Sequence, residues 1–338
     1  DMKLAFSTEN ISCPSFLELC DTAAEYGFSG IEIFDAGAEI AAHRDSLLDP
    51  ASTADSRRKL VNRHLEAAAL TYPDPICSAT APEPIADCVE LAANAGIQNV
   101  IIRFGAELPD GLESILTPAV KRAEEYGVAI LLETCGALAH TERALEVINR
   151  FATAALGTAW NIRETFFGGG ETADETIRTL GAYINYVRIG DRRAGTDVII
   201  CDGELPVRDF MNALRSLNYD GFICTDRNSE ITEPDVVLTH FVNYMNGAEE
   251  RKPTENIYYN RSRTGTFPWK KFDTVDLTFS QVLDEMAERY PDQYAFKYTT
   301  LDYTRTYSEF RDDVDRVAAA LISLGVKPGY HVAVWATN

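Results

Sequence analysis

The sequence lacks the features that mark several protein classes. No run approaches the about 18 consecutive apolar residues of a membrane-spanning helix. Residues 1–7 show no charged stretch leading into an apolar one, so no signal peptide is predicted. The seven cysteines are odd in number and no two have C-x-x-C spacing, which argues against a disulfide or zinc framework. We therefore expect a cytoplasmic protein with reduced thiols and no membrane partner.

Positive charge is also scarce. Lys and Arg number 31 against 52 Asp and Glu, which gives a formal net charge of −21. A field of this sign repels phosphate backbones, so we expect no nucleic-acid partner. Apolar residues make up 46% and charged residues 25%, as is typical of globular domains. The length of 338 residues is enough for about two of them.

The first 246 residues repeat a pattern of short apolar strands and amphipathic helices. Alternation of this kind predicts parallel strands joined by helical crossovers, and eight units have the size of a (β/α)8 barrel. An open doubly wound sheet is the alternative, but its glycine-rich first turn is missing, because residues 7–10 read STEN. We therefore predict an α/β fold with a (β/α)8 TIM barrel over residues 1–246. The expected strands are Lys3–Ser7, Gly30–Phe34, Ala67–Tyr72, Asn99–Phe104, Val128–Thr134, Leu156–Ile162, Asn185–Gly190 and Gly221–Thr225.

Helix boundary signals agree with this pattern. Ser15 can cap a helix that starts at Phe16, and Gly27 can end it. Gly96, Gly127 and Gly181 follow later helical stretches in the same way.

The repeat ends near Gly247. Residues 247–271 are polar and are predicted to be a linker. In residues 272–338 we expect an α+β segment with helices over 279–290 and 309–324, the second capped by Ser308, and strands over 295–299, 305–307 and 331–336. Such a segment is either a small appendage packed on the barrel or the incomplete start of a larger domain. The few strands available to bury the last one favour the second interpretation.

Five motifs link the first 246 residues to a known superfamily. They are GFSGIEI at 27–33, LLE at 131–133, WN at 160–161, VRIGD at 187–191, and GELP at 203–206 leading into LNYDGF at 217–222. On these motifs the region resembles the xylose-isomerase-like barrels, which include sugar isomerases, ketose 3-epimerases and endonuclease IV. Barrels of the epimerase type often pair, so the resemblance makes a homodimer a candidate.

A second resemblance covers residues from about 265 to 338. The motifs FPWKK at 267–271, AERYPD at 287–292, TYSEF at 306–310 and LGVKPG at 324–329 resemble the start of AMP-forming acyl-CoA synthetases. The chemical motifs of that family would follow residue 338. The resemblance therefore implies no ATP or CoA site in this chain, and it implies the remainder of a fused ligase domain as a partner.

Barrel sites lie at the C-terminal ends of the strands, where this sequence has Glu133, Asn161, Arg188 and Asp226. In the resembling isomerases and epimerases, these positions hold a divalent metal with Glu, Asp, His and Glu, and the two Glu residues move a proton through an enediolate. The resemblance therefore implies Glu133 and Asp226 as catalytic residues. It implies Glu133, Asn161 and Asp226 as the remaining ligands for a divalent metal such as Mn, Mg, Co or Zn.

Arg188 argues against that metal. A guanidinium offers no lone pair and stays protonated. Two positive centres ~4 Å apart repel by about 4 kcal/mol at an effective dielectric of about 20. None of the five histidines lies at a strand end. We expect a degenerate site with no cofactor, and a bound divalent metal is the disfavoured alternative.

The arginines at the strand ends suggest another role. Arg188 could act as a fixed cation within a mouth that attracts a sugar phosphate or sugar acid. Alternatively, Arg188 is neutralised by Glu133 and Asp226 in a buried ion network that only supports the barrel. The candidate substrate-binding residues are Arg103, Arg163, Glu164, Arg188 and Arg193, with Arg227 as a further cation of the mouth.

Two functions follow from these observations. The first is isomerisation or epimerisation of a sugar or sugar phosphate through Glu133 and Asp226, with a small anionic metabolite or sugar as ligand. The alternative is a catalytically inactive binding or scaffold barrel, fused to a protein whose main activity is AMP-forming acyl-CoA ligation.

Overall fold

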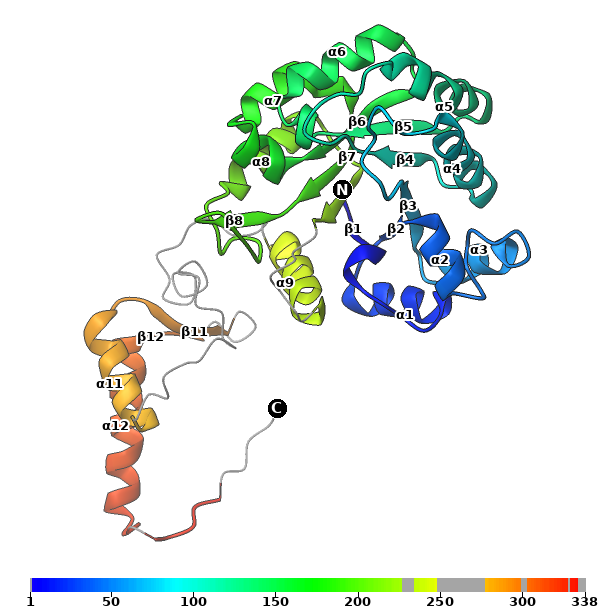
Figure 1. The fold of residues 1–338 in the computed structure, drawn as a ribbon. Helices are drawn as coiled ribbons and strands as arrows, with labels where there is room; N and C mark the ends of the chain where they lie inside the picture. The colour runs from blue at the N-terminus through cyan, green and yellow to red at the C-terminus, as the bar shows by residue number, and fades with distance from the viewer. Residues whose placement is uncertain (1, 227–233, 248–276, 299–302, 328, 334–338) are drawn as a thin grey trace. The chain divides into compact units, whose positions relative to one another are not determined.

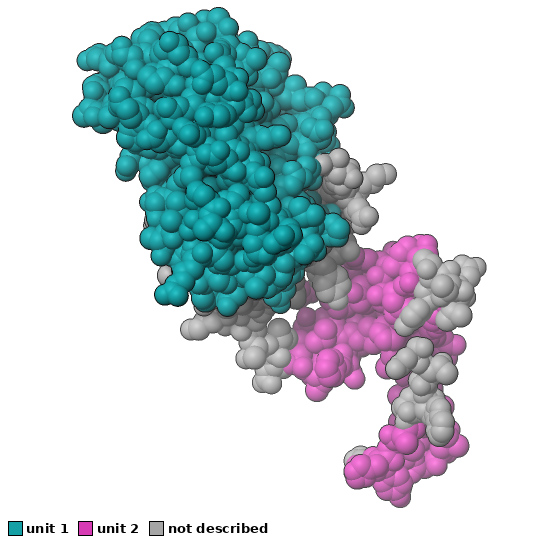
Figure 2. Space-filling model, turned by 90° about the vertical axis from the view of Figure 1, so that its right-hand side faces the viewer, with its two compact units in different colours: residues 1–253 teal, residues 254–338 magenta. Residues whose placement is uncertain are grey.

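The computed structural model describes residues 2–226, 234–247, 277–298, 303–327 and 329–333 (Figure 1). The chain divides into two compact units, residues 1–253 and 254–338 (Figure 2). The predicted linker, residues 247–271, lies outside the described residues except for Gly247. No helix among the described ranges is long and apolar enough to cross a bilayer.

The first unit is a closed barrel of eight parallel strands in the order β1-β10-β7-β6-β5-β4-β3-β2. The predicted (β/α)8 barrel is confirmed, and each predicted strand lies within two residues of the observed bounds. The strands are β1 (Lys3–Ser7), β2 (Gly30–Phe34), β3 (Glu66–Thr71), β4 (Asn99–Ile102), β5 (Ala129–Glu133), β6 (Leu156–Asn161), β7 (Ile184–Ile189) and β10 (Phe222–Thr225).

Helices surround the barrel, and the predicted capping residues lie at their ends. Ser15 Oγ accepts a hydrogen bond from the Glu18 amide at 3.1 Å, and Gly27 ends the same helix with a φ of 86°. The helices are α1 (Phe16–Tyr26), α2 (Ala36–Ala42), α3 (Thr53–Val61), α4 (Pro82–Ala95), α5 (Leu112–Tyr126), α6 (Thr141–Phe151), α7 (Ala173–Leu180), α8 (Val207–Ser216) and α9 (Pro234–Gly247). Short helical turns lie at Thr8–Asn10, Gly136–Leu138, Glu164–Gly168 and Gly181–Tyr183.

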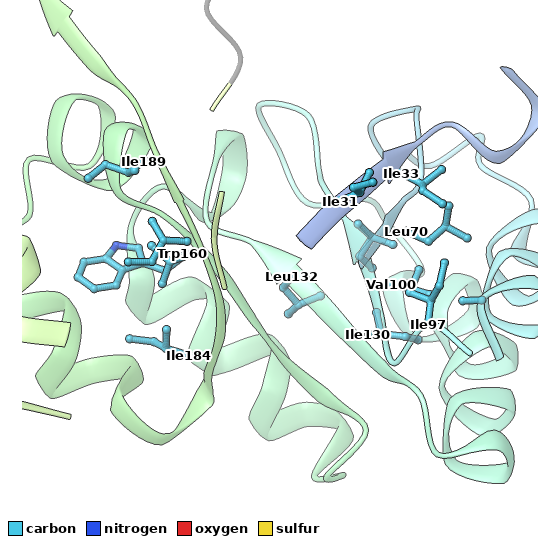
Figure 3. Packing of buried hydrophobic residues seen from close by; sticks show 14 of the residues in the cluster. Ile31, Ile33, Leu70, Ile97, Val100, Ile130, Leu132, Trp160, Ile184 and Ile189 are labelled. Carbon is cyan, nitrogen blue, oxygen red and sulfur yellow. The ribbon is translucent and has the colours of Figure 1, made fainter. Parts of the chain in front are cut away.

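Two layers of buried side chains build the core. Leu132 and Trp160 point out of the barrel and pack under the helices (Figure 3), whereas their neighbours Leu131 and Ala159 face the barrel interior. This alternation follows from the period of two along a strand. It continues to the strand ends and decides which polar residues meet inside the barrel.

A short antiparallel hairpin follows β7. Its strands are β8 (Asp191–Arg193) and β9 (Thr196–Val198). The sequence pattern did not predict them, because three-residue strands carry no measurable periodicity.

The second unit contains α11 (Phe279–Arg289), β11 (Tyr294–Tyr298), β12 (Tyr303–Thr306) and α12 (Tyr307–Ser323). The expected cap at Ser308 is wrong. Thr306 Oγ1 accepts from the Glu309 amide at 3.3 Å while the Glu309 carboxylate accepts from the Thr306 amide at 3.0 Å, so this capping box starts α12 two residues earlier. Of the strand expected over 331–336, residues 331–333 are described and form no strand; the others lie outside the described residues.

Candidate functional site

Six polar side chains meet at the C-terminal end of the barrel interior. Five of them lie two residues beyond a residue of the inner core cluster, so the strand period carries them inward. The sixth, Glu32, lies two residues beyond Gly30, where a Cβ would meet the inward-facing Phe222 ring. We call this set the inner network, and each member is at most 6% exposed. Its members are Glu32, Thr71, Glu133, Asn161, Arg188 and Asp226.

Arg188 is held by β2 and β3. Its Nη2 donates to Glu32 Oε1, and to Thr71 Oγ1 at 3.2 Å, and Thr71 Oγ1 donates to the same Glu32 oxygen at 3.0 Å. Arg188 Nη1 lies 4.0 Å from Glu133 Oε1. Burial by itself would lower the pKa of Arg188, but the carboxylates of Glu133 and Glu32 outweigh it and hold the pKa well above the usual arginine value. Arg188 is therefore a permanent cation inside the barrel.

Asn161 joins the two predicted catalytic carboxylates. Its Nδ2 donates to Glu133 Oε1 at 2.8 Å and to Asp226 Oδ2 at 3.2 Å. Its Oδ1 accepts from the Glu164 amide at 3.2 Å, and since only oxygen can accept there, the orientation of the side-chain amide follows. The Asn161 group that faces the two carboxylates is therefore an N–H donor.

Glu133 has an environment that favours its neutral form. Burial raises the pKa of its carboxyl, Arg188 opposes the rise, and Asp226 adds to it. Glu133 Oε2 is buried and makes no hydrogen bond. Asp226 instead forms an ion pair with Arg163, whose Nη2 lies 2.9 Å from Asp226 Oδ2. The two carboxyls thus differ in environment: burial raises the pKa of Glu133, whereas Asp226 is ion-paired.

A second layer of charges lies above the inner network. Arg163 Nε lies 3.1 Å from Glu164 Oε1, and its Nη1 lies 3.1 Å from Asp197 Oδ2. Arg192 reaches the same two carboxylates, at 3.3 Å for Glu164 and 3.0 Å for Asp197. The four side chains close a ring, which we call the rim ring. Arg163 connects it to Asp226 below.

The arginines predicted to form an anion-attracting mouth have separate surroundings where the structure describes them. Arg188 and Arg163 are each neutralised by carboxylates. Arg103 Nη2 donates to the Pro73 carbonyl at 2.6 Å, with its guanidinium 5.4 Å from the centre of the Phe34 ring. Arg193 is exposed on β8, and Arg227 lies outside the described residues.

The predicted structural alternative needs a correction too. Arg188 was expected to be neutralised by Glu133 and Asp226. Its ion pair with Glu133 is present, but its hydrogen-bond partners are Glu32 and Thr71, which the sequence analysis missed. A charged residue inside the otherwise apolar strand β2 is a signal that could have found Glu32.

A small pocket of about 20 Å³ opens beside Asp226. Its polar wall comes from Arg163, Asp191 and Asp226, and its apolar wall from the residues after β9 and from α9. The lining residues are Arg163, Ile189, Gly190, Asp191, Val198, Ile199, Ile200, Thr225, Asp226, Val237 and Phe241. Within the described part of the chain, no three His, Cys, Asp or Glu residues are arranged to hold a metal ion.

Solved structures with this fold are enzymes of several kinds. The probable 3-DHS dehydratase AsbF of Bacillus anthracis superposes with a TM-score of 0.60 at 15% identity, covering 72% of this chain and 99% of that protein. The 3-keto-D-glucoside 4-epimerase YcjR of E. coli superposes with a TM-score of 0.58 at 15% identity, covering 73% and 99%. At these identities the likeness shows the fold alone.

Curated relatives match only the C-terminal part. A mitochondrial medium-chain acyl-CoA ligase of Danio rerio is 36% identical over 61 residues, which are 18% of this chain and 10% of the ligase. A putative acyl-CoA synthetase of Bacillus subtilis is 32% identical over 66 residues, which are 20% of this chain and 12% of the synthetase. The chain thus spans about a tenth of the length of the curated relatives it matches.

Family models divide the chain in the same way. The AMP-binding enzyme model matches residues 283–338, and the xylose isomerase-like TIM barrel model matches residues 20–239. The second match covers well over half of the chain and spans strands β2 to β10 of the closed barrel. This protein therefore belongs to the xylose isomerase-like TIM barrel family and carries a segment similar to AMP-binding enzymes at its C-terminal end.

Proposed function

We propose that the barrel is a metal-independent site of the sugar isomerase and epimerase type, in which Glu133 and Asp226 exchange a proton with a sugar or sugar acid. The observation that carries this proposal is the contrast between the two carboxyls around Asn161 Nδ2. A neutral Glu133 can donate a proton, and the ion-paired Asp226 can accept one.

Metal independence rests on which groups face the carboxylates. A divalent cation needs oxygen or imidazole lone pairs around it. Here Asn161 presents an N–H between Glu133 and Asp226, and the Arg188 guanidinium lies 4.0 Å from Glu133. The residues present therefore do not fit a metal. Arg188 supplies fixed positive charge to the site instead.

The ligand would reach Asp226 from the side of the small pocket that Arg163 and Asp226 both line. Arg163 and Glu164 are the substrate-binding residues nearest to that route. Arg188 is buried beneath them and would act through its charge on Glu133 rather than by touching an anion. Arg103 and Arg193 stay outer candidates for contact with a phosphate or carboxylate of the substrate.

Solvent deuterium exchange tests the proposal. Ketoses, sugar acids and sugar phosphates are incubated with the protein in D2O, with and without EDTA, and exchange is followed by proton NMR. Exchange should proceed equally with EDTA, and Glu133→Gln and Asp226→Asn should each slow it by about 10²-fold or more. The matched control is Glu146→Gln on the exposed face of α6, and this variant should exchange deuterium into the sugar at the rate of the parent protein. Exchange that stops with EDTA would overturn the metal-independent site.

The burial of the inner network favours a second candidate, a non-catalytic barrel that binds a metabolite or supports the fused segment. A paired and nearly inaccessible network is also what a purely structural core would contain. Ligand binding without deuterium exchange would support a binding module. The absence of both would support a scaffold, with acyl-CoA ligation by the fusion protein as the main activity.

A further inference from the structure

The segment between β7 and α8, residues 191–205, folds around one buried carboxylate. Asp191 is 1% exposed. Its Oδ1 accepts from the backbone amides of Arg192 at 2.8 Å and Leu205 at 3.0 Å. Its Oδ2 accepts from those of Cys201 and Gly203, both at 2.9 Å. Four amides spread over fourteen residues are thus tied to one side chain, and we call residues 191–205 the rim segment.

Gly203 leaves no room for a side chain at this anchor. A Cβ there would lie 2.1 Å from Asp191 Oδ1 and 2.6 Å from the Arg192 carbonyl oxygen. The close approach of backbone and carboxylate therefore requires glycine.

The rim segment carries half of the rim ring. Arg192 and Asp197 belong to the rim segment, while Arg163 and Glu164 follow β6. Asp197 uses one oxygen for Arg163 and the other for Arg192, at 3.1 and 3.0 Å. The position of Asp197 thereby limits where the Arg163 guanidinium can lie, and Arg163 Nη2 is the donor 2.9 Å from Asp226.

We propose that Asp191 is a positioning residue of the acid–base site: its carboxylate folds the rim segment, and the rim segment holds Arg163 against Asp226. The inference rests on the proposed function, in which Asp226 is the base. The effect passes through Arg192 and Asp197: the Arg192 amide donates to Asp191, and Asp197 binds both Arg192 and Arg163.

Amide hydrogen exchange on the full chain tests whether the Asp191 carboxylate folds the rim segment. In Asp191→Asn the side-chain nitrogen cannot accept a hydrogen bond, so two of the four hydrogen bonds from backbone amides are lost. The amides of Cys201, Gly203 and Leu205 should exchange about tenfold faster or more, while those of β7 stay unchanged. Gly203→Ala should have the same effect with the carboxylate intact. Asp174→Asn, in the exposed first turn of α7, is the matched control. Equal exchange in Asp191→Asn and Asp174→Asn would overturn the proposal.

A double-mutant cycle tests whether the rim segment holds Arg163 against Asp226, and it needs no enzymatic activity. The coupling between Arg163→Gln and Asp226→Asn is measured by urea unfolding in the parent and in the Asp191→Asn background. It should fall by at least half when Asp191 is changed, whereas a merely local role for Asp191 would leave it intact and refute positioning. Gly203→Ala serves as the background if Asp191→Asn does not fold.

Deuterium exchange into the sugar then separates this inference from the proposed function. Asp191→Asn should slow it about tenfold, and adding Arg163→Gln should slow it little further, because both changes act on the same contact. If the parent catalyses no exchange, the proposed function fails while the urea cycle still decides the positioning role. If the double variant slows the exchange by the product of the two separate factors, Asp191 does not act through Arg163.

Discussion

The barrel encloses some charged side chains together with its apolar core, whereas most large apolar side chains described in the C-terminal unit face solvent. Trp160 and Phe6 are 0% exposed in the barrel, and Arg188 is buried against Glu32. Among the described residues of the C-terminal unit, the buried apolar ones are Ala287 and Tyr307, and Ile322 is 71% exposed. Both regions have regular helices and strands, so regular structure alone does not make a core.

The difference shows what local signals can achieve. Capping boxes at Thr278 and Thr306 start α11 and α12 without any distant contact. Burial needs elements far apart in sequence, and the barrel obtains it by closing β1 against β10. The second half of α12 exposes Val317 and Ile322, and a helix without a packed face is only marginally stable in water.

The largest expected effect comes from removing the buried cation. Arg188→Met leaves Glu32 and Glu133 as buried carboxylates without their guanidinium, which should lower the free energy of unfolding by about 3–5 kcal/mol. Urea unfolding measures it, and adding Glu32→Gln should recover part of the loss. The matched change Arg305→Met removes a partly exposed ion pair to Asp313 and should shift the unfolding midpoint far less than Arg188→Met does. A similar response to both changes would remove the contrast between the two units.

Truncation of an apolar side chain should also cost much more unfolding free energy in the barrel than in the C-terminal unit. Leu132 is 0% exposed, so Leu132→Ala should cost about 2–5 kcal/mol of unfolding free energy through lost contacts and a cavity. Ile322→Ala on α12 should cost less than about 0.5 kcal/mol. A large loss at Ile322 would mean that this face is covered in solution.

The pH dependence of stability should sharpen the description of Glu133. Because its pKa is raised in the folded protein, the native state binds a proton more tightly than the unfolded state does. Stability from this group is present below the ordinary glutamate pKa and falls as the pH rises from there toward the native pKa. Glu133→Gln should therefore gain stability relative to the parent across that window, by at most about 1.4 kcal/mol per pH unit. Unfolding curves from pH 4 to 8 measure it, with Glu146→Gln as control, and a constant difference between Glu133→Gln and the parent would contradict it.

The smallest expected effect is that of metal ions. After incubation with Mn²⁺, Co²⁺ or Zn²⁺ and desalting, elemental analysis should find far less than one ion per chain, and the melting temperature should not move. Near-unit occupancy, or a clear rise in melting temperature, would show that the site is not closed to cations.

Most of the fold was predictable from the sequence because strand periodicity and helix caps are local. The convergence of Glu133, Asn161, Arg188 and Asp226 was predictable too, since parallel strands bring their C-terminal ends together. The pairing inside the site was not. Glu32 and Arg188 are 156 residues apart, and their contact depends on barrel closure and on side-chain conformations.

The fold of the rim segment could not be predicted from the sequence either. The four amides that bind Asp191 come from irregular backbone, which has no repeating pattern to read. The start of α12 was missed by two residues because Thr306 and Ser308 are both good caps, and only the position of Glu309 relative to Thr306 completes the capping box.

Arg188 differs from a bound ion in being covalently part of the chain. A tethered cation cannot dissociate, be chelated or be exchanged for a competing metal, so the charge inside this barrel is set once, at translation. A cell short of manganese or rich in zinc would leave it untouched.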